Sequence, residues 1–210
     1  TVPVTVDELI PLCRGVVRGV RRALVVADLP FGSYESNADH ALATAVRFMK
    51  EAGAHAVKIE GGIRSVDQIT RITQSGIPVM AHIGFTPQSE HGLGGHVVQG
   101  RGEDAAKLIA DGKAVEAAGA FAVVVEMVPK TVATQLASEL TIPVIGIGAG
   151  NGVDGQILVW TDLVGMSTGR IPSFVKQYAS LHETLRTAVT NWQNDVRSRA
   201  FPDDAHSFVD

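Results

Sequence analysis

Residues 54–62 read Ala54-His55-Ala56-Val57-Lys58-Ile59-Glu60-Gly61-Gly62, and this stretch decides the fold that we predict. It has the pattern of a short buried strand that carries a cation and an anion two positions apart. Because successive side chains of a strand point to opposite faces, Lys58 and Glu60 share one face. A buried charge costs several kcal/mol in lost hydration unless another charge, a metal or a ligand pairs with it. Lys58 and Glu60 therefore indicate either a structural ion pair or a functional site.

Apolar runs that predict strands alternate with helical patterns on both sides of this stretch. The other predicted strands lie at residues 23–27, 78–84, 121–126, 143–150 and, more weakly, 157–160. The predicted helices lie at about residues 5–20, 36–53, 65–76, 103–119, 130–140 and 173–196. Capping boxes are expected for the first helix (Thr5 and Glu8) and the third (Ser65 and Gln68), with Ser36 capping the second. This alternation predicts right-handed βαβ units and a parallel sheet.

A (β/α)8 barrel and a doubly wound sheet both fit the alternation, and the polar residues at the strand ends decide between them. Four such residues lie at or beside the carboxyl ends of four different predicted strands: Asp28, Glu60, His82 and Glu126. Barrel active sites are assembled from several strand ends, whereas a doubly wound sheet binds its ligand at one switch point. We therefore predict an α/β fold of the (β/α)8 TIM-barrel type. Only six strands are visible, so we expect the barrel to be N-terminally incomplete.

The composition is that of a globular domain with a substantial core. Of 210 residues, 45% are hydrophobic and 19% are charged, and we expect one barrel domain over residues 1–210, with the helix 173–196 and an irregular tail at 201–210. The net charge of −4 argues against a surface that binds nucleic acid or an anionic membrane. No apolar run approaches membrane-spanning length. Cys13 is the single cysteine, so no internal disulfide can form, and this suits a reducing cytoplasm. We expect the Cys13 side chain to be buried and to fill space in the core.

Three carboxylates and a histidine at one barrel mouth would suit a divalent metal. Carboxylates with water favour a hard cation such as Mg2+, and a nearby histidine leaves Zn2+ or Co2+ open. Glu126 follows an apolar run, so burial is expected to raise its pKa towards the range of a general base. Taken singly, His82 is more often a hydrogen-bonded core histidine, and Asp28 could cap a turn. Together these residues predict metal-assisted proton abstraction next to a carbonyl group.

Three glycine-rich patterns allow other interpretations. Residues 146–151 resemble a dinucleotide fingerprint but lack its third glycine, so we reject that reading. Residues 165–169 match a nucleophile elbow, with Asp203 and His206 following in the order of a hydrolase. No predicted strand follows to carry the aspartate, so we disfavour a serine hydrolase. Residues 92–102 are either a mobile lid over the barrel mouth or a solvated surface loop.

Segments spread over nearly the whole chain carry a family resemblance. They are residues 26–31 (Val-Ala-Asp-Leu-Pro-Phe), 57–62 (Val-Lys-Ile-Glu-Gly-Gly), 81–89 (Ala-His-Ile-Gly-Phe-Thr-Pro-Gln-Ser), 98–102 (Val-Gln-Gly-Arg-Gly), 125–129 (Val-Glu-Met-Val-Pro), 142–150 (Ile-Pro-Val-Ile-Gly-Ile-Gly-Ala-Gly), 201–202 and 206–208. In this order they resemble the 3-methyl-2-oxobutanoate hydroxymethyltransferase (ketopantoate hydroxymethyltransferase) family. The resemblance implies a (β/α)8 barrel of the phosphoenolpyruvate mutase and isocitrate lyase superfamily. It also implies a cytoplasmic homo-oligomer, a decamer in that family.

The resemblance further implies a reaction and a role for each matching residue. The family transfers a one-carbon unit from 5,10-methylenetetrahydrofolate to 3-methyl-2-oxobutanoate, giving 2-dehydropantoate in pantothenate and coenzyme A biosynthesis. Asp28 and Glu60 resemble the metal-site residues, Asp28 and Lys58 resemble contacts to the 2-oxo acid, and Glu126 resembles the proton acceptor. His82 would lie just outside these contacts. Mg2+ would hold the 2-oxo acid, Glu126 would remove the C3 proton, and the enolate would attack the methylene carbon.

One departure from the family leaves two alternatives open. The family's first two strands carry a Gly-Asp-Ser segment, with another metal-site aspartate and a substrate-contacting serine, and this segment has no counterpart here. The first alternative is therefore an inactive remnant with a structural role. The second is a related lyase of the same superfamily that acts on another 2-oxo acid.

Overall fold

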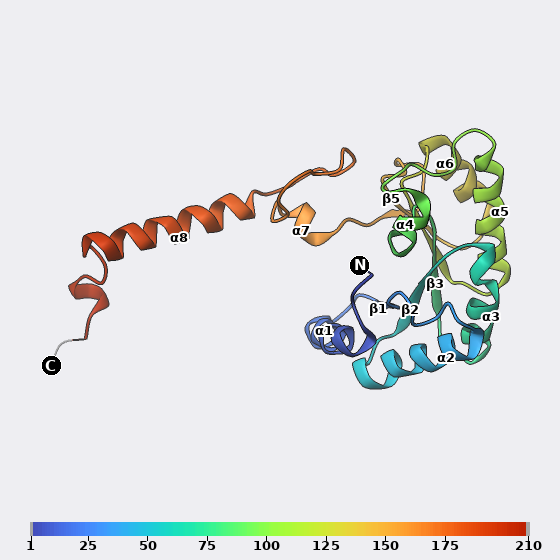
Figure 1. The fold of residues 1–210 in the computed structure, drawn as a ribbon, viewed down its shortest axis with the longest axis horizontal. Helices are drawn as coiled ribbons and strands as arrows, with labels where there is room; N and C mark the ends of the chain where they lie inside the picture. Colours follow the sequence, from blue (N-terminus) through green and yellow to red (C-terminus); the bar gives the residue numbers. More distant parts are fainter. Residues whose placement is uncertain (1, 209–210) are drawn as a thin grey trace. The chain divides into compact units, whose positions relative to one another are not determined.

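The computed structural model describes residues 2–208 and divides the chain into two units, residues 1–157 and 158–210. Each unit is described by itself below, with the elements labelled as in Figure 1. The prediction of a single domain over residues 1–210 remains a prediction.

The first unit is built on a six-stranded parallel sheet whose strands follow one another in chain order. The strands are β1 (Val26–Asp28), β2 (Ala56–Glu60), β3 (Val79–Gly84), β4 (Ala122–Glu126), β5 (Val144–Ile147) and β6 (Gly155–Gln156). A doubly wound sheet reverses its strand order at a switch point, and this sheet does not. The sequential order confirms the barrel-type prediction, with a sheet that the described residues leave open between β1 and β6.

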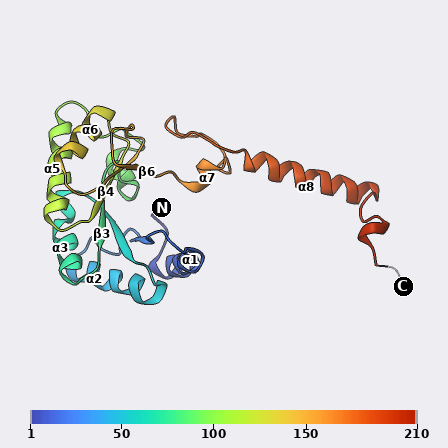
Figure 2. The same ribbon diagram turned by 180° about the vertical axis from the view of Figure 1, so that it is seen from behind.

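Helices cover one face of this sheet, and both views of the fold show α2, α3 and α5 side by side along it (Figures 1 and 2). The helices of the unit are α1 (Val6–Gly19), α2 (Ala38–Arg47), α3 (Val66–Gln74), α4 (Glu90–Leu93), α5 (Asp104–Ala117) and α6 (Lys130–Glu139). Alternate strand residues, among them Val57, Ile59 and Val123, are fully buried in one apolar core with Ile72 and Leu136. The residues between them, Lys58 and Glu60 included, therefore face the opposite side, as the period of two predicts.

The structure confirms one predicted helix cap and corrects two. Thr5 and Glu8 form the capping box of α1, since the Thr5 side chain accepts from the Glu8 N–H and the Glu8 carboxylate accepts from the Thr5 N–H. The prediction of Ser36 as a cap is wrong by one position, because extended Asn37 accepts the His40 N–H. The capping box at Ser65 is also wrong, because the Ser65 hydroxyl donates 2.9 Å to the Glu60 carbonyl oxygen.

The prediction of a strand at residues 157–160 is wrong, since the last strand is β6 at Gly155–Gln156. The Ile157 N–H makes the final bond to β5, through the Gly146 carbonyl. Val159 already precedes α7 (Trp160–Leu163), and its carbonyl accepts N–H groups of that helix. Because the Val159 carbonyl accepts these hydrogen bonds, it does not pair with a neighbouring strand. The sheet therefore ends before the apolar run at residues 157–160.

The second unit contains α7, α8 (Leu181–Ser198) and a 3-10 turn at Asp204–His206. The predicted helix 173–196 therefore begins too early, because α8 starts at Leu181. The backbone of the preceding segment is used elsewhere, since the N–H groups of Tyr178 and Leu181 donate to the carbonyls of Leu163 and Val164. The tail predicted to be irregular holds only that 3-10 turn within its described part, residues 201–208.

Two smaller predictions can be compared with the fold. Cys13 lies buried on the inner side of α1 and is free, as predicted for a filler of the core. For residues 85–102, which lie between a predicted strand and a predicted helix, the sequence predicts no helix, but they contain a 3-10 turn at Pro87–Ser89 followed by α4. None of the helices formed by residues 2–208 is both long and apolar enough to cross a membrane.

Candidate active site

The five residues predicted for the site come together at the carboxyl ends of β1 to β4. Asp28, Glu60 and Glu126 are the last residues of β1, β2 and β4. The parallel register pairs Asp28 with Lys58 across β1 and β2, and Glu60 with His82 across β2 and β3. Because parallel strands end at the same edge of a sheet, their terminal side chains share one surface, which is where barrel enzymes bind substrate.

Lys58 and His82 connect the acidic side chains of this cluster. Lys58 Nζ lies 2.8 Å from Asp28 Oδ1 and 3.3 Å from His82 Nδ1. On its other side, His82 Nε2 lies 3.2 Å from Glu126 Oε2, and Glu60 Oε1 lies 3.8 Å from His82 Nδ1. Lys58 therefore forms an ion pair with Asp28 of the neighbouring strand β1. The ion pair between Lys58 and Glu60 within β2, which the sequence left open, is not the one formed.

The protonation state of His82 follows from its surroundings. Burial, and then the positive charge of Lys58, lower the pKa of His82 to about 3, so the imidazole is neutral at pH 7. An ammonium group can only donate hydrogen bonds, so Nδ1, which faces Lys58, is the accepting nitrogen. The proton therefore resides on Nε2, which faces the Glu126 carboxylate.

Both glutamates of the cluster have raised pKa values. Burial raises the pKa of Glu126 to about 7, against the opposing effect of the Lys58 charge. Burial also raises the pKa of Glu60 to about 7, against the Lys58 charge and a hydrogen bond from the Gln88 backbone N–H. A carboxylate with a pKa near 7 is a stronger base than an exposed one and is still deprotonated in a large fraction of molecules at neutral pH.

Two atoms of this cluster are buried without a hydrogen bond. Within residues 2–208 the buried side-chain polar atoms in this state are Asp28 Oδ1, His82 Nε2 and Gln68 Oε1. The contacts of Asp28 with Lys58 and of His82 with Glu126 are close but are not aligned as hydrogen bonds. Because an unsatisfied buried polar group costs about 1–3 kcal/mol, the two atoms indicate a place where a bound ligand completes the pairing.

The donor set fits a cation held by few protein ligands. No three His, Cys, Asp or Glu side chains within residues 2–208 are placed to hold an ion, so the three carboxylates and the histidine at this mouth do not form a complete set of metal ligands by themselves. Asp28 and Glu60 remain as a pair of carboxylates. Mg2+ is commonly bound by one or two carboxylates with water and substrate oxygens, whereas a zinc site needs three or four protein ligands. The residues therefore fit Mg2+ better than Zn2+.

The backbone around Glu126 is closely packed, which sequence reasoning did not predict. Gly84 has a φ of +86°, and a Cβ atom there would lie 2.4 Å from the Glu126 carbonyl oxygen. The same oxygen accepts the Phe85 N–H at 2.9 Å. Met127, directly after Glu126, has a φ of 47°, a left-handed conformation that non-glycine residues rarely adopt. Its carbonyl accepts the Gln99 N–H at 2.9 Å, which ties residues 92–102 to the end of β4.

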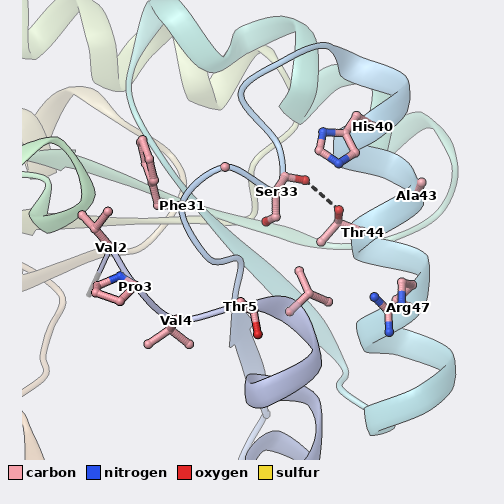
Figure 3. Close-up of a pocket in the computed structure, with 12 residues that line it drawn as sticks. Val2, Pro3, Val4, Thr5, Phe31, Ser33, His40, Ala43, Thr44 and Arg47 are labelled. Carbon is pink, nitrogen blue, oxygen red and sulfur yellow. Dashed lines mark hydrogen bonds between the residues drawn. The ribbon is translucent and has the colours of Figure 1, made fainter.

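The described cavities differ in how they relate to these residues. One of about 430 Å3 lies between the N-terminal segment, the loop after β1 and α2, and Figure 3 shows His40, Thr44 and Arg47 on its helical side. None of the five predicted site residues lines it. A second cavity, of about 350 Å3, is lined by Glu60 together with Tyr34 and Gln88. The second is therefore the one connected to the candidate site.

The disfavoured hydrolase elbow gains no support from the second unit. Ser167 donates to the hydroxyl of Thr161, and His206 forms an exposed ion pair with Asp203 at the far end of the chain. The serine and the histidine lie on either side of α8 in the sequence, and a helix of its 18 residues is about 27 Å long. The structure records no contact between Ser167 and His206.

Comparison with known proteins gives close relatives. The family described as ketopantoate hydroxymethyltransferase matches residues 1–204. A 3-methyl-2-oxobutanoate hydroxymethyltransferase from Leifsonia xyli is 63% identical over 208 residues, which is 99% of this chain and 75% of that protein. The enzyme of the same name from a Nocardioides strain is 62% identical, over 99% of this chain and 70% of that protein. The chain thus spans about three quarters or slightly less of these relatives.

Solved structures share the fold at low sequence identity. A crystal structure of 2,3-dimethylmalate lyase, a member of the PEP mutase and isocitrate lyase superfamily, has a TM-score of 0.56 at 14% identity, over 98% of this chain and 72% of that chain. Phosphonopyruvate hydrolase, solved with oxalate and Mg2+, has a TM-score of 0.55 at 15% identity, over 97% and 73%. At such identities the likeness concerns the fold alone, and it agrees with the barrel-type fold described above.

Proposed function

The chain belongs to the ketopantoate hydroxymethyltransferase family, and we propose that it transfers a hydroxymethyl group from 5,10-methylenetetrahydrofolate to 3-methyl-2-oxobutanoate. The product is 2-dehydropantoate, a precursor in pantothenate and coenzyme A biosynthesis. The observation that carries this proposal is that two buried atoms of the cluster make no hydrogen bond: Asp28 Oδ1, next to Lys58, and His82 Nε2, next to Glu126. An oxygen of a small anionic 2-oxo acid would accept from the His82 Nε2–H, whereas Asp28 Oδ1, which can only accept, would be paired by a bound cation.

Lys58 is the residue that binds the 2-oxo acid by charge. Its side chain is only 16% exposed, and the nearby Asp28 and His82 keep the ammonium group at the ends of β1 to β3. A partly buried ammonium attracts carboxylate and oxo oxygens more strongly than an exposed one, because water screens the charge less. It also stabilises the negative charge that develops on the C2 oxygen as the C3 proton leaves.

Glu126 is the base of the reaction. Its Oε2 accepts the proton from C3 of the bound acid, the electrons of the C3–H bond form a C2–C3 double bond, and the C2 carbonyl electrons move to oxygen. His82 keeps its own proton on Nε2, close to Glu126 Oε2, and so limits the directions in which the carboxylate can turn. In the transfer the enolate carbon bonds to the methylene carbon of the folate, and water supplies the hydroxyl oxygen, while both C–N bonds of that methylene carbon break. Tetrahydrofolate leaves, and its two nitrogens take up one proton from water and the proton that Glu126 removed from C3.

Asp28 and Glu60 are the residues that would hold Mg2+. Bound there, the ion would supply a Lewis acid for the oxo group of the substrate. Asp28 Oδ1 has no hydrogen bond, so it keeps a lone pair for a cation. Co2+ and Zn2+ are the alternatives to Mg2+, and metal titration of the purified chain separates them.

The test of this function is exchange of the C3 hydrogen of 3-methyl-2-oxobutanoate with D2O, followed by NMR in the presence of Mg2+. We expect Glu126→Gln to lower the exchange rate by about 10^2–10^4-fold, the usual contribution of a positioned base. Glu139→Gln, which removes an exposed carboxylate paired with Lys113, is the control and keeps the parent rate. We also expect the rate to rise with pH through about 7, where Glu126 loses its proton.

The outcomes distinguish the proposal from its alternatives. Exchange at the parent rate in Glu126→Gln would remove Glu126 from the role of base. Exchange without folate-dependent formation of 2-dehydropantoate would favour a related lyase that acts on another 2-oxo acid. No exchange at all by the parent chain with Mg2+ would favour a structural remnant.

We also propose a cytoplasmic homo-oligomer. The single cysteine suits a reducing compartment. The apolar side chains along α8 support an interface, because Leu185, Val189, Trp192 and Val196 recur at helical spacing and are exposed. Light scattering of the purified chain tests this, and a monomer at micromolar concentration would contradict it.

A further inference from the structure

Two buried polar side chains that the proposed reaction does not use lie beside Glu60. Tyr34 is 2% exposed and belongs to the loop after β1, and Gln88 is 6% exposed and belongs to the 3-10 turn after β3. They therefore come from segments more than fifty positions apart. Buried polar groups are normally hydrogen-bonded, so the partners of these two side chains indicate what they do.

Four hydrogen bonds join Tyr34, Gln88, Glu60 and Leu29 in one network. The Glu60 N–H donates to the Tyr34 hydroxyl at 3.3 Å, and this hydroxyl donates to Gln88 Oε1 at 2.8 Å. Gln88 Nε2 donates to the Leu29 carbonyl at 2.8 Å, and the Gln88 backbone N–H donates to Glu60 Oε2 at 2.9 Å. Each donor thus has its acceptor within the network.

The chemistry of the partners fixes the direction of every bond in this network. The Leu29 carbonyl can only accept, so the amide nitrogen of Gln88 must face Leu29 and its oxygen must face Tyr34. The Tyr34 hydroxyl accepts from the Glu60 N–H and therefore donates to Gln88. Burial raises the pKa of Tyr34, so the hydroxyl keeps the proton that it donates. Only one arrangement of hydrogens satisfies all four bonds.

The network connects the two carboxylates of the proposed metal site. Leu29 directly follows Asp28, and its N–H donates to the Lys58 carbonyl at 3.0 Å while its carbonyl accepts from Gln88. Leu29 is thus held through both its N–H group and its carbonyl group. Gln88 also holds the Glu60 carboxylate through its own backbone N–H. A single residue therefore fixes the backbone next to one carboxylate and the oxygen of the other.

We propose that Gln88, oriented by Tyr34, is a positioning residue that sets the separation of the Asp28 and Glu60 carboxylates and so the affinity of this pair for Mg2+. The inference rests on the proposed metal site and goes beyond it, because the proposed reaction gives Gln88 and Tyr34 no role of their own. Groups that orient metal ligands in this way commonly change metal affinity by about 10–100-fold when they are replaced.

Substitutions can separate this role from ordinary packing. In Gln88→Glu, one carboxylate oxygen can still accept from Tyr34, but the other faces the Leu29 carbonyl with no proton to donate, so the link to the Asp28 segment breaks. Tyr34→Phe removes only the hydroxyl. Ser65→Ala is the matched control, because Ser65 is equally buried and also bonds Glu60, but through the carbonyl oxygen and not the carboxylate.

The experiment is binding of Mn2+, a spectroscopic substitute for Mg2+, to the whole chain and its three variants, measured by electron paramagnetic resonance at pH 8. Thermal unfolding of the metal-free proteins is measured alongside. We expect Gln88→Glu to raise the Kd for Mn2+ by about 10–100-fold, Tyr34→Phe to raise it less, and Ser65→Ala to keep the parent Kd while lowering the Tm.

The results overturn the proposal in distinguishable ways. A parent-like Kd in folded Gln88→Glu refutes the positioning role and leaves the metal site intact. If Gln88→Glu does not fold, Tyr34→Phe decides, and a parent-like Kd there refutes the role. An equal loss of affinity in Ser65→Ala shows general loosening and also refutes it. No binding of Mn2+ by the parent refutes the metal site and, with it, the positioning of its ligands.

Discussion

The molecule contains two clusters of acidic and basic side chains that differ in how completely they are paired. On the surface of the first unit, Arg47 lies 2.8 Å from Asp7 and 2.7 Å from Glu51, and all these contacts are aligned hydrogen bonds between exposed groups. At the ends of β1 to β4, the buried cluster around Lys58 leaves atoms of Asp28 and His82 without hydrogen bonds.

The difference indicates which cluster is functional. Exposed ion pairs are screened by water and add little to stability, so a fully satisfied surface cluster needs no ligand. Buried groups with shifted pKa values and incomplete pairing are typical of sites where substrate or metal supplies the missing partner. The pKa of Glu51 is lowered by Arg47, whereas the pKa of Glu126 is raised to about 7 by burial. The pKa of a glutamate is thus shifted in opposite directions in the two clusters.

The largest effect that separates the clusters is expected for Lys58→Met. Removal of the ammonium group deletes the charge that we propose as the stabiliser of the enolate oxygen, and we expect the C3 exchange rate to fall by about 10^2–10^3-fold. Lys113→Met removes the lysine of an exposed pair with Glu139 and is expected to leave the rate unchanged. Comparable losses in both variants, measured by the same NMR assay, would show that the buried cluster has no special role.

A second effect concerns stability and its pH dependence. The pKa of Glu126 rises from 4.5 to about 7 on folding, so ionisation of this group opposes folding above pH 7 and has no such effect below pH 4.5. By linkage, we expect Glu126→Gln to increase the free energy of unfolding by about 3 kcal/mol at pH 8, with a gain that disappears towards pH 4.5. Urea unfolding at both pH values measures this. A gain that is the same at both would contradict the raised pKa.

The smallest effect is expected for Arg47→Met in the surface cluster. Its ion pairs with Asp7 and Glu51 are exposed, so their loss is expected to change the Tm only slightly and to leave the C3 exchange rate at its parent value. Calorimetry and the exchange assay provide the two readings. A large loss of exchange in this variant would mean that the surface cluster, next to the cavity of Figure 3, contributes to the reaction.

Sequence alone could place the residues that end the strands. Asp28, Glu60, His82 and Glu126 follow apolar runs, and parallel strands bring such positions to one edge, so their convergence needs no knowledge of distant contacts. The partner of Lys58 was less certain, because an alternating pattern fixes the face of a side chain and not the neighbour that it meets. The register of β1 against β2 places Asp28 opposite Lys58, and this makes Asp28 the partner in the ion pair.

The network around Gln88 could not be predicted from local patterns. Its bonds join residues that are 26 to 59 positions apart, and no spacing rule connects a loop after one strand to a turn two strands later. Ser65 shows the same limit at short range. The position of Ser65 before a helix predicts that its side chain caps the helix. The Ser65 hydroxyl instead donates to the buried carbonyl oxygen of Glu60. Local preference is overridden where a buried backbone oxygen would otherwise stay unpaired.

The left-handed backbone of Met127 has a consequence for anyone who engineers this chain. A non-glycine residue in that conformation costs on the order of 1–3 kcal/mol, and glycine would adopt it freely. A search for thermostable variants would therefore select Met127→Gly early. The hydrogen bond from the Gln99 N–H goes to the Met127 backbone carbonyl, so the substitution keeps it. Glycine also allows the backbone after Glu126 many more conformations, so a more stable protein obtained by this route would hold the proposed base less firmly.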